Sequence, residues 1–238
     1  MPVLAALDRR DRVPELMDGP GLEPAEHRAA LAALARINRL SLSAEILWPP
    51  IRAAARENPG RPARVLDVAT GSGDVPLRLW HKARRAGIAV EIAGCDVSPT
   101  ALEEAARGAG PAGAGLRFFR HDAIRDPLPG GFDVVTCSLF LHHLSEDDAV
   151  TVLRRMRDAA GRLVLVNDLA RSRFNYLAVW LACRLTTRSR VVRFDGPASV
   201  RSAFTPAEAR ALAERAGLSG ATVSRRFPCR FLLSWSRP

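Results

Sequence analysis

The chain has 238 residues, of which 47% are hydrophobic and 25% are charged. This composition excludes a disordered chain and suffices for one α/β domain with helical additions. The formal charge is +10, and because Lys82 is the only lysine, nearly all of the basic charge comes from arginine. Such charge favours anionic substrates, nucleic acid or acidic lipid head groups, although a solvated arginine-rich surface is the simpler interpretation, which we favour.

The cysteines and the start of the chain exclude further classes of protein. Cys95, Cys137, Cys183 and Cys229 are scattered, with no C-x-x-C pair and no nearby histidine ligand. We therefore expect neither a disulfide framework nor a metal site. Too few apolar residues precede Asp8 for a hydrophobic targeting core, so we expect a cytoplasmic protein.

The first half of the chain changes from helical patterns to an alternation of strands and helices. Helical spacing of apolar residues predicts an amphipathic helix over 24–39, and a second helix over 43–56 is expected to be interrupted at Pro49 and Pro50. The alternation after residue 62 predicts a parallel sheet covered on both faces, with a ligand crevice at the carboxyl ends of its strands. The expected strands are 63–69, 89–95, 116–120, 133–138 and 162–167, and the expected helices are 74–86, 98–108 and 145–158.

The pattern differs after residue 170. An apolar stretch over 174–183, with arginines on both sides, is too short to span a bilayer. A capping pattern at Thr205 and a stop at Gly217 predict a helix. Two β-rich runs, 221–227 and 229–235, are expected to complete the sheet as a hairpin with Pro228 at its bend.

A glycine-containing turn, "LDVATGSGD", follows the first predicted strand. Gly71 and Gly73 lie where this strand turns into a helix, and glycine lets a ligand approach that backbone closely. A dinucleotide fingerprint would need Gly or Ala near Pro76, so we do not expect a pyrophosphate site or a nicotinamide-dependent oxidoreductase. Asp67 and Asp74 flank the turn, and their carboxylates favour a cation or an amino group.

Two more acids follow the next predicted strands. Asp96 ends "VEIAGCD", where a carboxylate can accept hydrogen bonds from both ribose hydroxyls. Asp122, in "FFRHDA", is placed to accept from the exocyclic amine of adenine. A carboxylate at three successive strand ends suits a ligand with adenine, ribose and an amino-acid tail, although Asp67 and Asp74 could simply cap the turn and the helix.

These motifs, in this order, resemble those of the class I S-adenosylmethionine-dependent methyltransferases from about Arg64 to Leu169. The resemblance implies a Rossmann-like α/β fold with a seven-stranded, mostly parallel sheet and helices on both faces. It also implies an N-terminal helical cap over 1–60 and a methyltransferase domain over 61–238, with a helical lid insertion over 170–204. S-adenosylmethionine would be the cofactor and S-adenosylhomocysteine its product. The implied cofactor-binding residues are Asp67, Thr70, Gly71, Gly73, Asp74, Asp96, Val97, Asp122, Ala123 and Ser138.

The segment "LHHLSEDDAV" resembles the part of small-molecule O-methyltransferases in which a histidine deprotonates a hydroxyl. On this match His142 is the base, with His143 beside it on the rim of the crevice. A phenol titrates near 10 and histidine near 6.5, so a positioned imidazole can assist proton removal. The family's acidic orienter position holds Asn167, and Asp168 stands next to it, so both remain candidates and we predict Asp168 as catalytic. A histidine that only binds its loop is the open alternative.

The N-terminal segment resembles the leader of methyltransferases related to the ubiquinone/menaquinone family, often found beside type III polyketide synthases. That resemblance implies lipophilic phenols, such as alkylresorcinols, as acceptors. C-methylation of a quinone-like ring and an RNA-associated protein are the alternatives, although nucleic acid is not our expectation. The apolar insertion over 170–204 is expected to form a lid, and transient membrane contact and a dimer interface are its alternative roles. The oligomeric state, monomer or homodimer, stays open. The residues expected to roof the acceptor pocket are Phe174, Tyr176, Leu177 and Trp180.

Overall fold

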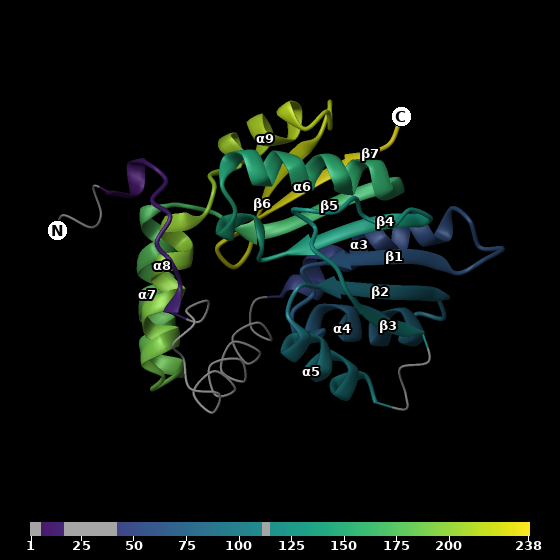
Figure 1. The fold of residues 1–238 in the computed structure, drawn as a ribbon, viewed down its shortest axis with the longest axis horizontal. Helices are drawn as coiled ribbons and strands as arrows, with labels where there is room; N and C mark the ends of the chain where they lie inside the picture. Colours follow the sequence, from purple (N-terminus) through teal and green to yellow (C-terminus); the bar gives the residue numbers. More distant parts are fainter. Residues whose placement is uncertain (1–5, 17–41, 111–114) are drawn as a thin grey trace.

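The computed structural model describes residues 6–16, 42–110 and 115–238, and its centre is a seven-stranded sheet (Figure 1). The strand order is β3-β2-β1-β4-β5-β7-β6. The first five strands are parallel, whereas β7 runs antiparallel to both of its neighbours. The predicted fold is therefore confirmed. The strands are β1 (Ala63–Val68), β2 (Val90–Asp96), β3 (Leu116–Arg120), β4 (Phe132–Ser138), β5 (Ala160–Leu169), β6 (Thr222–Arg226) and β7 (Arg230–Ser236).

Helices cover both faces of this sheet (Figure 1). On one face, Leu153 and Met156 belong to a core with Val135 and Val164 of the central strands. On the other face a second core forms around Leu47, together with buried residues of the same central strands. The helices of the first face are α6 (Glu146–Ala159) and α9 (Pro206–Arg215), and those of the second are α3 (Ser43–Arg56), α4 (Asp74–Arg85) and α5 (Pro99–Ala109).

The expected interruption of the helix at residues 43–56 is wrong. Helix α3 continues through Pro49 and Pro50. Both prolines lack the N–H that would bond one turn back, but Leu47 and Ile51 on either side of them are almost fully buried in the second core. Packing against the sheet thus offsets the lost hydrogen bonds. The amphipathic helix expected over 24–39 lies outside the described residues.

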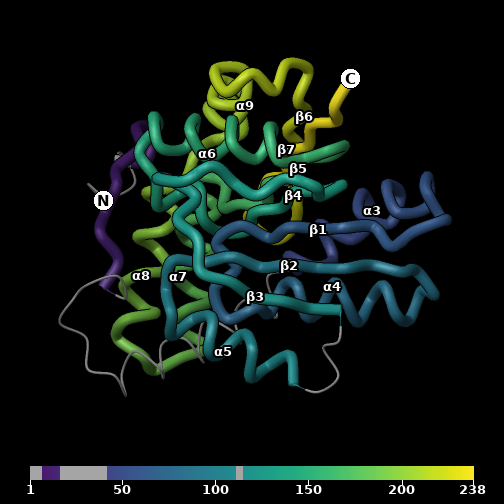
Figure 2. Tube along the Cα trace, turned by 45° about the vertical axis from the view of Figure 1, so that its right-hand side comes forward, coloured from purple at the N-terminus to yellow at the C-terminus, as the bar shows by residue number. Residues whose placement is uncertain are grey.

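The insertion after β5 is a pair of helices, α7 (Arg173–Thr186) and α8 (Arg190–Ser202). They pack side by side and stand beyond the end of the sheet at which β5 stops (Figures 1 and 2). Cys183 is the one buried residue of α7, whereas α8 buries eight of its residues. Helix α7 therefore packs on α8 rather than on the sheet, and the role of the pair as a lid stays a prediction. No helix in the described part of the chain combines the length and the apolar character needed to cross a bilayer.

An N-terminal strap, residues 6–16, runs along α8 from Ser202 to Asp195 and also contacts the loop that follows β4 (Figure 2). Arg10 fixes it by donating to the carbonyls of Ser202, His142 and Leu144, at 2.6, 3.0 and 2.7 Å. The Arg10 guanidinium also lies 3.7 Å from the ring centroid of Phe204. The strap therefore brings residues from the start of the chain to the carboxyl ends of β4 and β5.

Candidate functional site

The turn between β1 and α4 contains two glycines whose surroundings differ. Gly71 and Gly73 have φ values of 55° and 74°, in the left-handed region that side chains disfavour. A Cβ on Gly73 would lie 2.9 Å from Cβ of Ala105 and 3.0 Å from Cζ of Phe118. A Cβ on Gly71 would meet nothing within 4 Å. Gly73 therefore permits close packing, and Gly71 leaves open space above the turn.

Asp67 lies beneath this turn with only 2% of its surface exposed. Its carboxylate accepts hydrogen bonds from the hydroxyls of Thr70, at 2.9 Å, and Thr136, at 2.7 Å. Burial raises the pKa of Asp67 to about 6, although the two hydroxyls oppose that shift. The structure thus gives Asp67 a supporting position under the loop, while Thr70 tethers the loop to it.

Asp96 joins the glycine turn to the end of β2. One carboxylate oxygen accepts from the Gly71 amide at 2.9 Å, and the other accepts from the Ser98 amide at 3.0 Å. Val97, between them, is 52% exposed. Across the turn, the Ser72 hydroxyl donates to Asp74 at 3.3 Å. The predicted ribose acid is therefore at the carboxyl edge of the sheet, directly beside the glycine turn.

Asp122 follows β3 and organises the loop into which this strand leads. Its Oδ1 accepts from the amides of Ile124 and Arg125, at 2.9 and 3.1 Å. Ala123 is buried, and its carbonyl accepts from Arg155 of α6 at 2.9 Å. This turn stands at the same edge of the sheet as Asp96, since β2 and β3 are parallel neighbours.

The residues at this edge fit S-adenosylmethionine. Carboxylates stand at the ends of β1, β2 and β3, and the space above Gly71 is open. The buried hydroxyl of Ser138, at the end of β4, has no hydrogen-bond partner among the described residues. A sulfonium and an amino group are cationic, so this donor set suits them better than it suits a pyrophosphate.

His142 is held in the turn after β4 by Asp168 at the end of β5. Nδ1 of the ring lies 2.7 Å from one carboxylate oxygen, and the other oxygen accepts from the His142 amide at 3.2 Å. His142 is 4% exposed and Asp168 is 1% exposed. Asn167 points to the opposite side of the sheet, where its amide donates to the Ser43 hydroxyl at 3.0 Å. Asp168 is therefore the residue that orients the ring.

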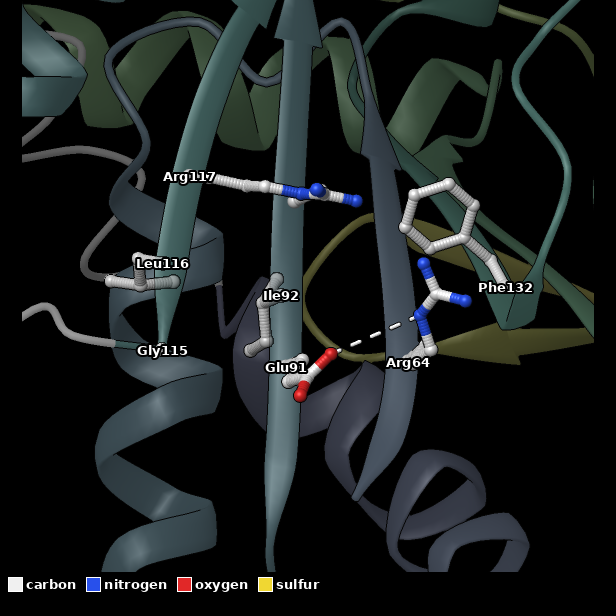
Figure 3. Close-up of a pocket in the computed structure, with 8 residues that line it drawn as sticks. Arg64, Glu91, Ile92, Gly115, Leu116, Arg117 and Phe132 are labelled. Carbon is white, nitrogen blue, oxygen red and sulfur yellow. Dashed lines mark ion pairs between the residues drawn. The ribbon is translucent and has the colours of Figure 1, made fainter. Parts of the chain in front are cut away.

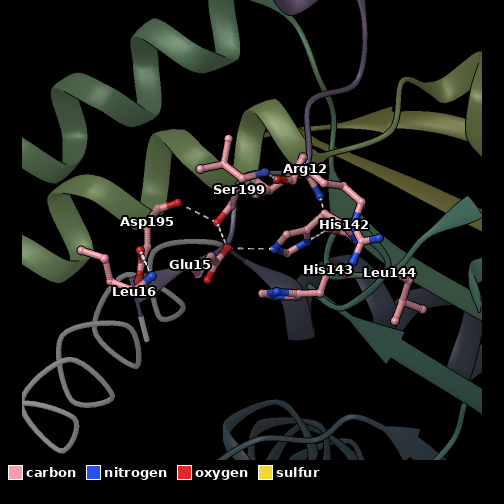
Figure 4. A network of polar contacts seen from close by, with 12 residues as sticks. Arg12, Glu15, Leu16, His142, His143, Leu144, Asp195 and Ser199 are labelled. Carbon is pink, nitrogen blue, oxygen red and sulfur yellow. Dashed lines mark hydrogen bonds and ion pairs between the residues drawn. The ribbon is translucent and has the colours of Figure 1, made fainter. Parts of the chain in front are cut away.

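A second carboxylate, which the sequence analysis missed, stands on the other side of the ring. Glu15 of the N-terminal strap places Oε1 3.7 Å from Nε2 of His142, and it accepts a hydrogen bond from the Ser199 hydroxyl (Figure 4). Burial lowers the pKa of His142, but Asp168 and Glu15 together outweigh it and raise the pKa to about 9. Burial likewise raises the pKa values of both carboxyls, and the imidazole lowers them to below their ordinary values. At neutral pH His142 is therefore an imidazolium between two carboxylates.

His143 completes the cluster, with its ring centroid 4.2 Å from that of His142. One potential ligand atom from each of Glu15, His142 and His143 lies within 4.8 Å of the others, a spacing that could accommodate a metal ion. The charge pairing described above accounts for the positions of Glu15 and His142 without one. The expectation that no metal takes part stays a prediction.

Several polar atoms at the carboxyl edge of the sheet, on the side that faces α3, are buried and lack hydrogen-bond partners among the described residues. The register pairs Ser138 with Asn167 and Leu169 with Arg230, so all four side chains leave the sheet on one side. The Ser138 hydroxyl, Oδ1 of Asn167, and Nε and Nη1 of Arg230 are buried and have no hydrogen-bond partner in the part of the chain that the structure describes. Burial lowers the pKa of Arg230 to about 10 even though Asp168 opposes that shift. Arg230 is a second buried polar residue at this edge that sequence reasoning missed.

Two cavities lie away from this edge. The first, of about 180 Å³, is at the amino ends of β1, β2 and β3, where Arg64 and Glu91 form an ion pair of 3.8 Å (Figure 3). The second, of about 410 Å³, lies between α3 and the β6–β7 hairpin and is lined in part by Leu232 and Ser234. Neither is lined by His142 or by the glycine turn.

The residues expected to roof an acceptor pocket are largely on the surface of α7. Phe174 is 77% exposed, Leu177 is 50% exposed and Trp180 is 38% exposed, whereas Tyr176 is half-buried. The structure therefore does not enclose these side chains, and their contact with an acceptor stays a prediction.

The strand order, the antiparallel β7 and the acid-lined carboxyl edge define the class I methyltransferase fold. Residues 65–161 match the family described as "Methyltransferase domain". Two curated proteins named demethylmenaquinone methyltransferase are similar to this chain. The one from Deinococcus radiodurans is 39% identical over 134 residues, and the one from Thermus thermophilus is 36% identical over 133. The matches cover 55% of this chain and 53% and 58% of the relatives, so the chain spans little more than half of their length.

Solved structures share the fold at low sequence identity. The plantazolicin methyltransferase BamL, solved with S-adenosylhomocysteine, has a TM-score of 0.64 at 14% identity over 88% of this chain and 90% of its own. An O-methyltransferase family 2 protein from Planctomyces limnophilus, in complex with apigenin, has a TM-score of 0.62 at 19% identity. The match covers 98% of this chain and 66% of that protein. Magnesium protoporphyrin IX methyltransferase from Synechocystis, with bound S-adenosylmethionine, has a TM-score of 0.54 at 16% identity. The match covers 94% of this chain and 88% of that protein.

Residues 65–161 thus match a methyltransferase domain, and the chain has the fold of the class I, S-adenosylmethionine-dependent methyltransferases. S-adenosylmethionine is the cofactor of this class, as predicted.

Proposed function

We propose that the protein transfers the methyl group of S-adenosylmethionine to a phenolic oxygen of a small lipophilic aromatic acceptor, with His142 as the general base. The observation that carries this proposal is the buried His142–Asp168 pair, with 2.7 Å between Nδ1 and Oδ1, at the edge that also holds the glycine turn. When bound, the cofactor supplies a methyl group on a sulfonium, which an oxygen nucleophile can attack in line.

The chain contributes orientation and proton removal. With Nδ1–H donated to Asp168, Nε2 of His142 is the atom that accepts the acceptor's proton. Glu15 now occupies the region next to Nε2 and keeps it protonated. An acceptor hydroxyl that displaces the Glu15 carboxylate would remove one negative charge from beside the ring and lower the pKa of His142. The Nε2 proton would then leave with the departing Glu15 carboxylate or pass to solvent, and the neutral Nε2 could accept the proton of the acceptor hydroxyl. Asp168 then stabilises the imidazolium that forms.

The acceptor class rests on the unpaired groups at the edge. Arg230, Ser138 and Asn167, whose side chains leave the sheet on the side opposite to Asp168, offer donors and an acceptor to a further oxygen of the acceptor at this edge. A polyketide-type phenol, such as an alkylresorcinol, fits this description.

A second candidate is C-methylation of a quinone-like ring, which the name of the two curated relatives favours. In that reaction His142 would deprotonate a ring hydroxyl, a ring carbon would take the methyl group, and the hydrogen on that carbon would then leave as a proton, which restores the aromatic ring. The arginine-rich composition also keeps RNA in the acceptor panel as a third candidate.

Mass spectrometry tests these candidates with deuterated S-adenosylmethionine and a panel of alkylated phenols, quinols and RNA. We expect a labelled product that fragments with loss of the methyl group from oxygen, and a His142→Ala variant slower by about a hundredfold or more. Label retained on a ring carbon would support the second candidate. Turnover of His142→Ala within about threefold of the unmodified protein would refute the base role.

A further inference from the structure

Exposed large apolar side chains are concentrated on the α7–α8 pair. Nine such side chains occur among residues 6–16, 42–110 and 115–238, and six of them belong to these two helices. On α7, Leu181 is 51% exposed and Leu185 is 77% exposed. The six are Phe174, Leu177, Trp180, Leu181, Leu185 and Phe194.

The apolar side chains of α7 form a stripe along one side of the helix. Phe174, Leu177, Leu181 and Leu185 are spaced by three or four residues, which aligns them on one helical face. The opposite face packs on α8, where a Cβ on Gly196 would lie 2.5 Å from Sγ of Cys183. Helix α7 therefore uses one face for its partner helix, and no part of the described chain covers the apolar stripe. We call this stripe, with Trp180, the α7 apolar face.

Arginine surrounds the α7 apolar face, and acidic residues are absent from the sequence over 170–194. Arg171 is buried and paired with Glu208, and Arg173 pairs with Asp8. Four other arginines of this segment are exposed and form no ion pair among the described residues. The guanidinium of Arg184, one of these four, lies 3.8 Å from the ring centroid of Trp180. They are Arg184, Arg188, Arg190 and Arg193.

These features favour an anionic bilayer, rather than a second copy of the chain, as the partner of the α7 apolar face. A two-fold interface through the α7 apolar face would bring the same unpaired arginines of both copies together without a counter-charge. Phospholipid head groups supply negative phosphates beside an apolar interior, which suits arginine and tryptophan around a row of leucines. With 14 residues, α7 is too short to cross a bilayer and can lie only in its surface.

We propose that the α7 apolar face and its arginines dock the protein on a membrane that contains anionic phospholipid, with the axis of α7 parallel to the membrane surface. Because α8 contacts the turn that carries His142, docking through α7 places the carboxyl edge of the sheet near the lipid. A lipophilic acceptor could then reach that edge from the bilayer. The docking itself depends on no step of the proposed chemistry.

Vesicle flotation of the full chain tests the proposal without turnover. Phosphatidylcholine vesicles are compared with vesicles that also contain phosphatidylglycerol, at low and high salt. We expect binding to the anionic vesicles that weakens with salt, and a loss of about tenfold or more in the Leu181→Ser/Leu185→Ser variant. Arg184→Gln/Arg188→Gln should lower binding to the anionic vesicles in the same direction.

Two matched controls separate docking from general effects. Phe227→Ser removes an apolar side chain that is 83% exposed on the β6–β7 turn, and Arg225→Gln removes an exposed charge from β6. Both should bind as the unmodified chain does, and all variants should keep the thermal midpoint and the affinity for S-adenosylhomocysteine. Equal binding by Leu181→Ser/Leu185→Ser, or no binding to anionic vesicles, would overturn the proposal. So would a dimer in sedimentation that this double variant dissociates while vesicle binding is absent.

Discussion

Oε1 of Glu15 lies 3.7 Å from Nε2 of His142, on the side of the imidazole that faces away from Asp168. The two residues are far apart in sequence, and the N-terminal strap brings them together through contacts of Arg10 with the loop that follows β4. The proposed base is therefore covered by a carboxylate in this conformation. This arrangement makes the protonation state of His142 depend on the strap.

Replacement of Glu15 should change the pH at which the protein works. Glu15→Gln removes one of the two negative charges that raise the pKa of His142 to about 9, so the acidic limb of the kcat/KM profile should move to lower pH. A pH series of initial rates measures the limb, and NMR of the imidazole carbons measures the pKa directly. Asp8→Asn on the same strap, whose partner is the exposed Arg173, is the matched control. An unmoved limb and an unmoved imidazole titration would show that Glu15 does not control the base.

The stability of the fold should also depend on His142. Its pKa is about 9 in the folded protein against 6.5 for the ordinary group. The imidazolium thus stabilises the fold fully below pH 6.5, and this contribution is lost as the pH rises to about 9. The pKa values of Asp168 and Glu15 are lowered on folding, so their contribution is present at neutral pH and is lost as the pH falls through those lowered values. Thermal midpoints between pH 6.5 and 9 should fall more steeply for the unmodified chain than for His142→Gln, and parallel curves would contradict the pairing.

Removal of the orienting charge should slow the chemical step. Asp168→Asn keeps the size of the side chain but no longer stabilises an imidazolium, so kcat should fall by about a hundredfold or more. Steady-state kinetics with saturating cofactor measures this effect. Asp158→Asn, an exposed acid paired with Arg157, should leave kcat unchanged. If both variants lost activity equally, the 2.7 Å contact of Asp168 would have no special part in turnover.

The glycine turn should tolerate no side chain at Gly73. Gly73→Ala combines a φ of 74° with a Cβ that would lie 2.9 Å from Ala105, so the free energy of unfolding should fall by about 1–3 kcal/mol. Gly108→Ala in helix α5, where nothing lies within 4 Å, should instead raise it by about 0.5–1 kcal/mol. Urea denaturation measures both. A Gly73→Ala variant as stable as the unmodified chain would contradict the packing described for the turn.

Replacement of Arg230 should weaken acceptor binding and stabilise the fold. Its Nε and Nη1 are buried without partners, so Arg230→Met should raise the free energy of unfolding by about 1 kcal/mol while acceptor affinity falls. Thermal unfolding and the KM for the acceptor measure the two effects. Arg225→Met on the exposed part of the same hairpin should change neither. A destabilised Arg230→Met variant with unchanged KM would assign Arg230 to the fold alone.

The sequence was sufficient to predict the sheet and the glycine turn because local signals define both. Short β-rich runs alternate with helical ones, and Gly71, Gly73 and Asp96 lie at the strand ends where the structure has them. The choice between Asn167 and Asp168 needed the structure. The two residues are adjacent, and the pleat of β5 sends them to opposite sides of the sheet, so only the register identifies the one that reaches His142.

Other features depend on contacts that no local pattern shows. Pro49 and Pro50 predict a break in α3, but burial of the helix against the sheet outweighs them. The apolar residues of α7 suggest a buried helix, yet most of them are exposed because α8 occupies the opposite face. Glu15 carries no motif, and its place beside His142 follows from the path of the strap.

The central claim is that the carboxyl edge of β1, β2 and β3 binds S-adenosylmethionine. Isothermal titration calorimetry of the full chain with S-adenosylhomocysteine tests it most directly, because the product binds without turnover. We predict one site per chain and an affinity that Asp96→Ala lowers by about tenfold or more, since hydrogen bonds to a charged group are lost. Glu91→Gln, an exposed acid on the same strand, should bind as tightly as the unmodified chain. Absence of binding, or binding that Asp96→Ala leaves unchanged, would contradict the account.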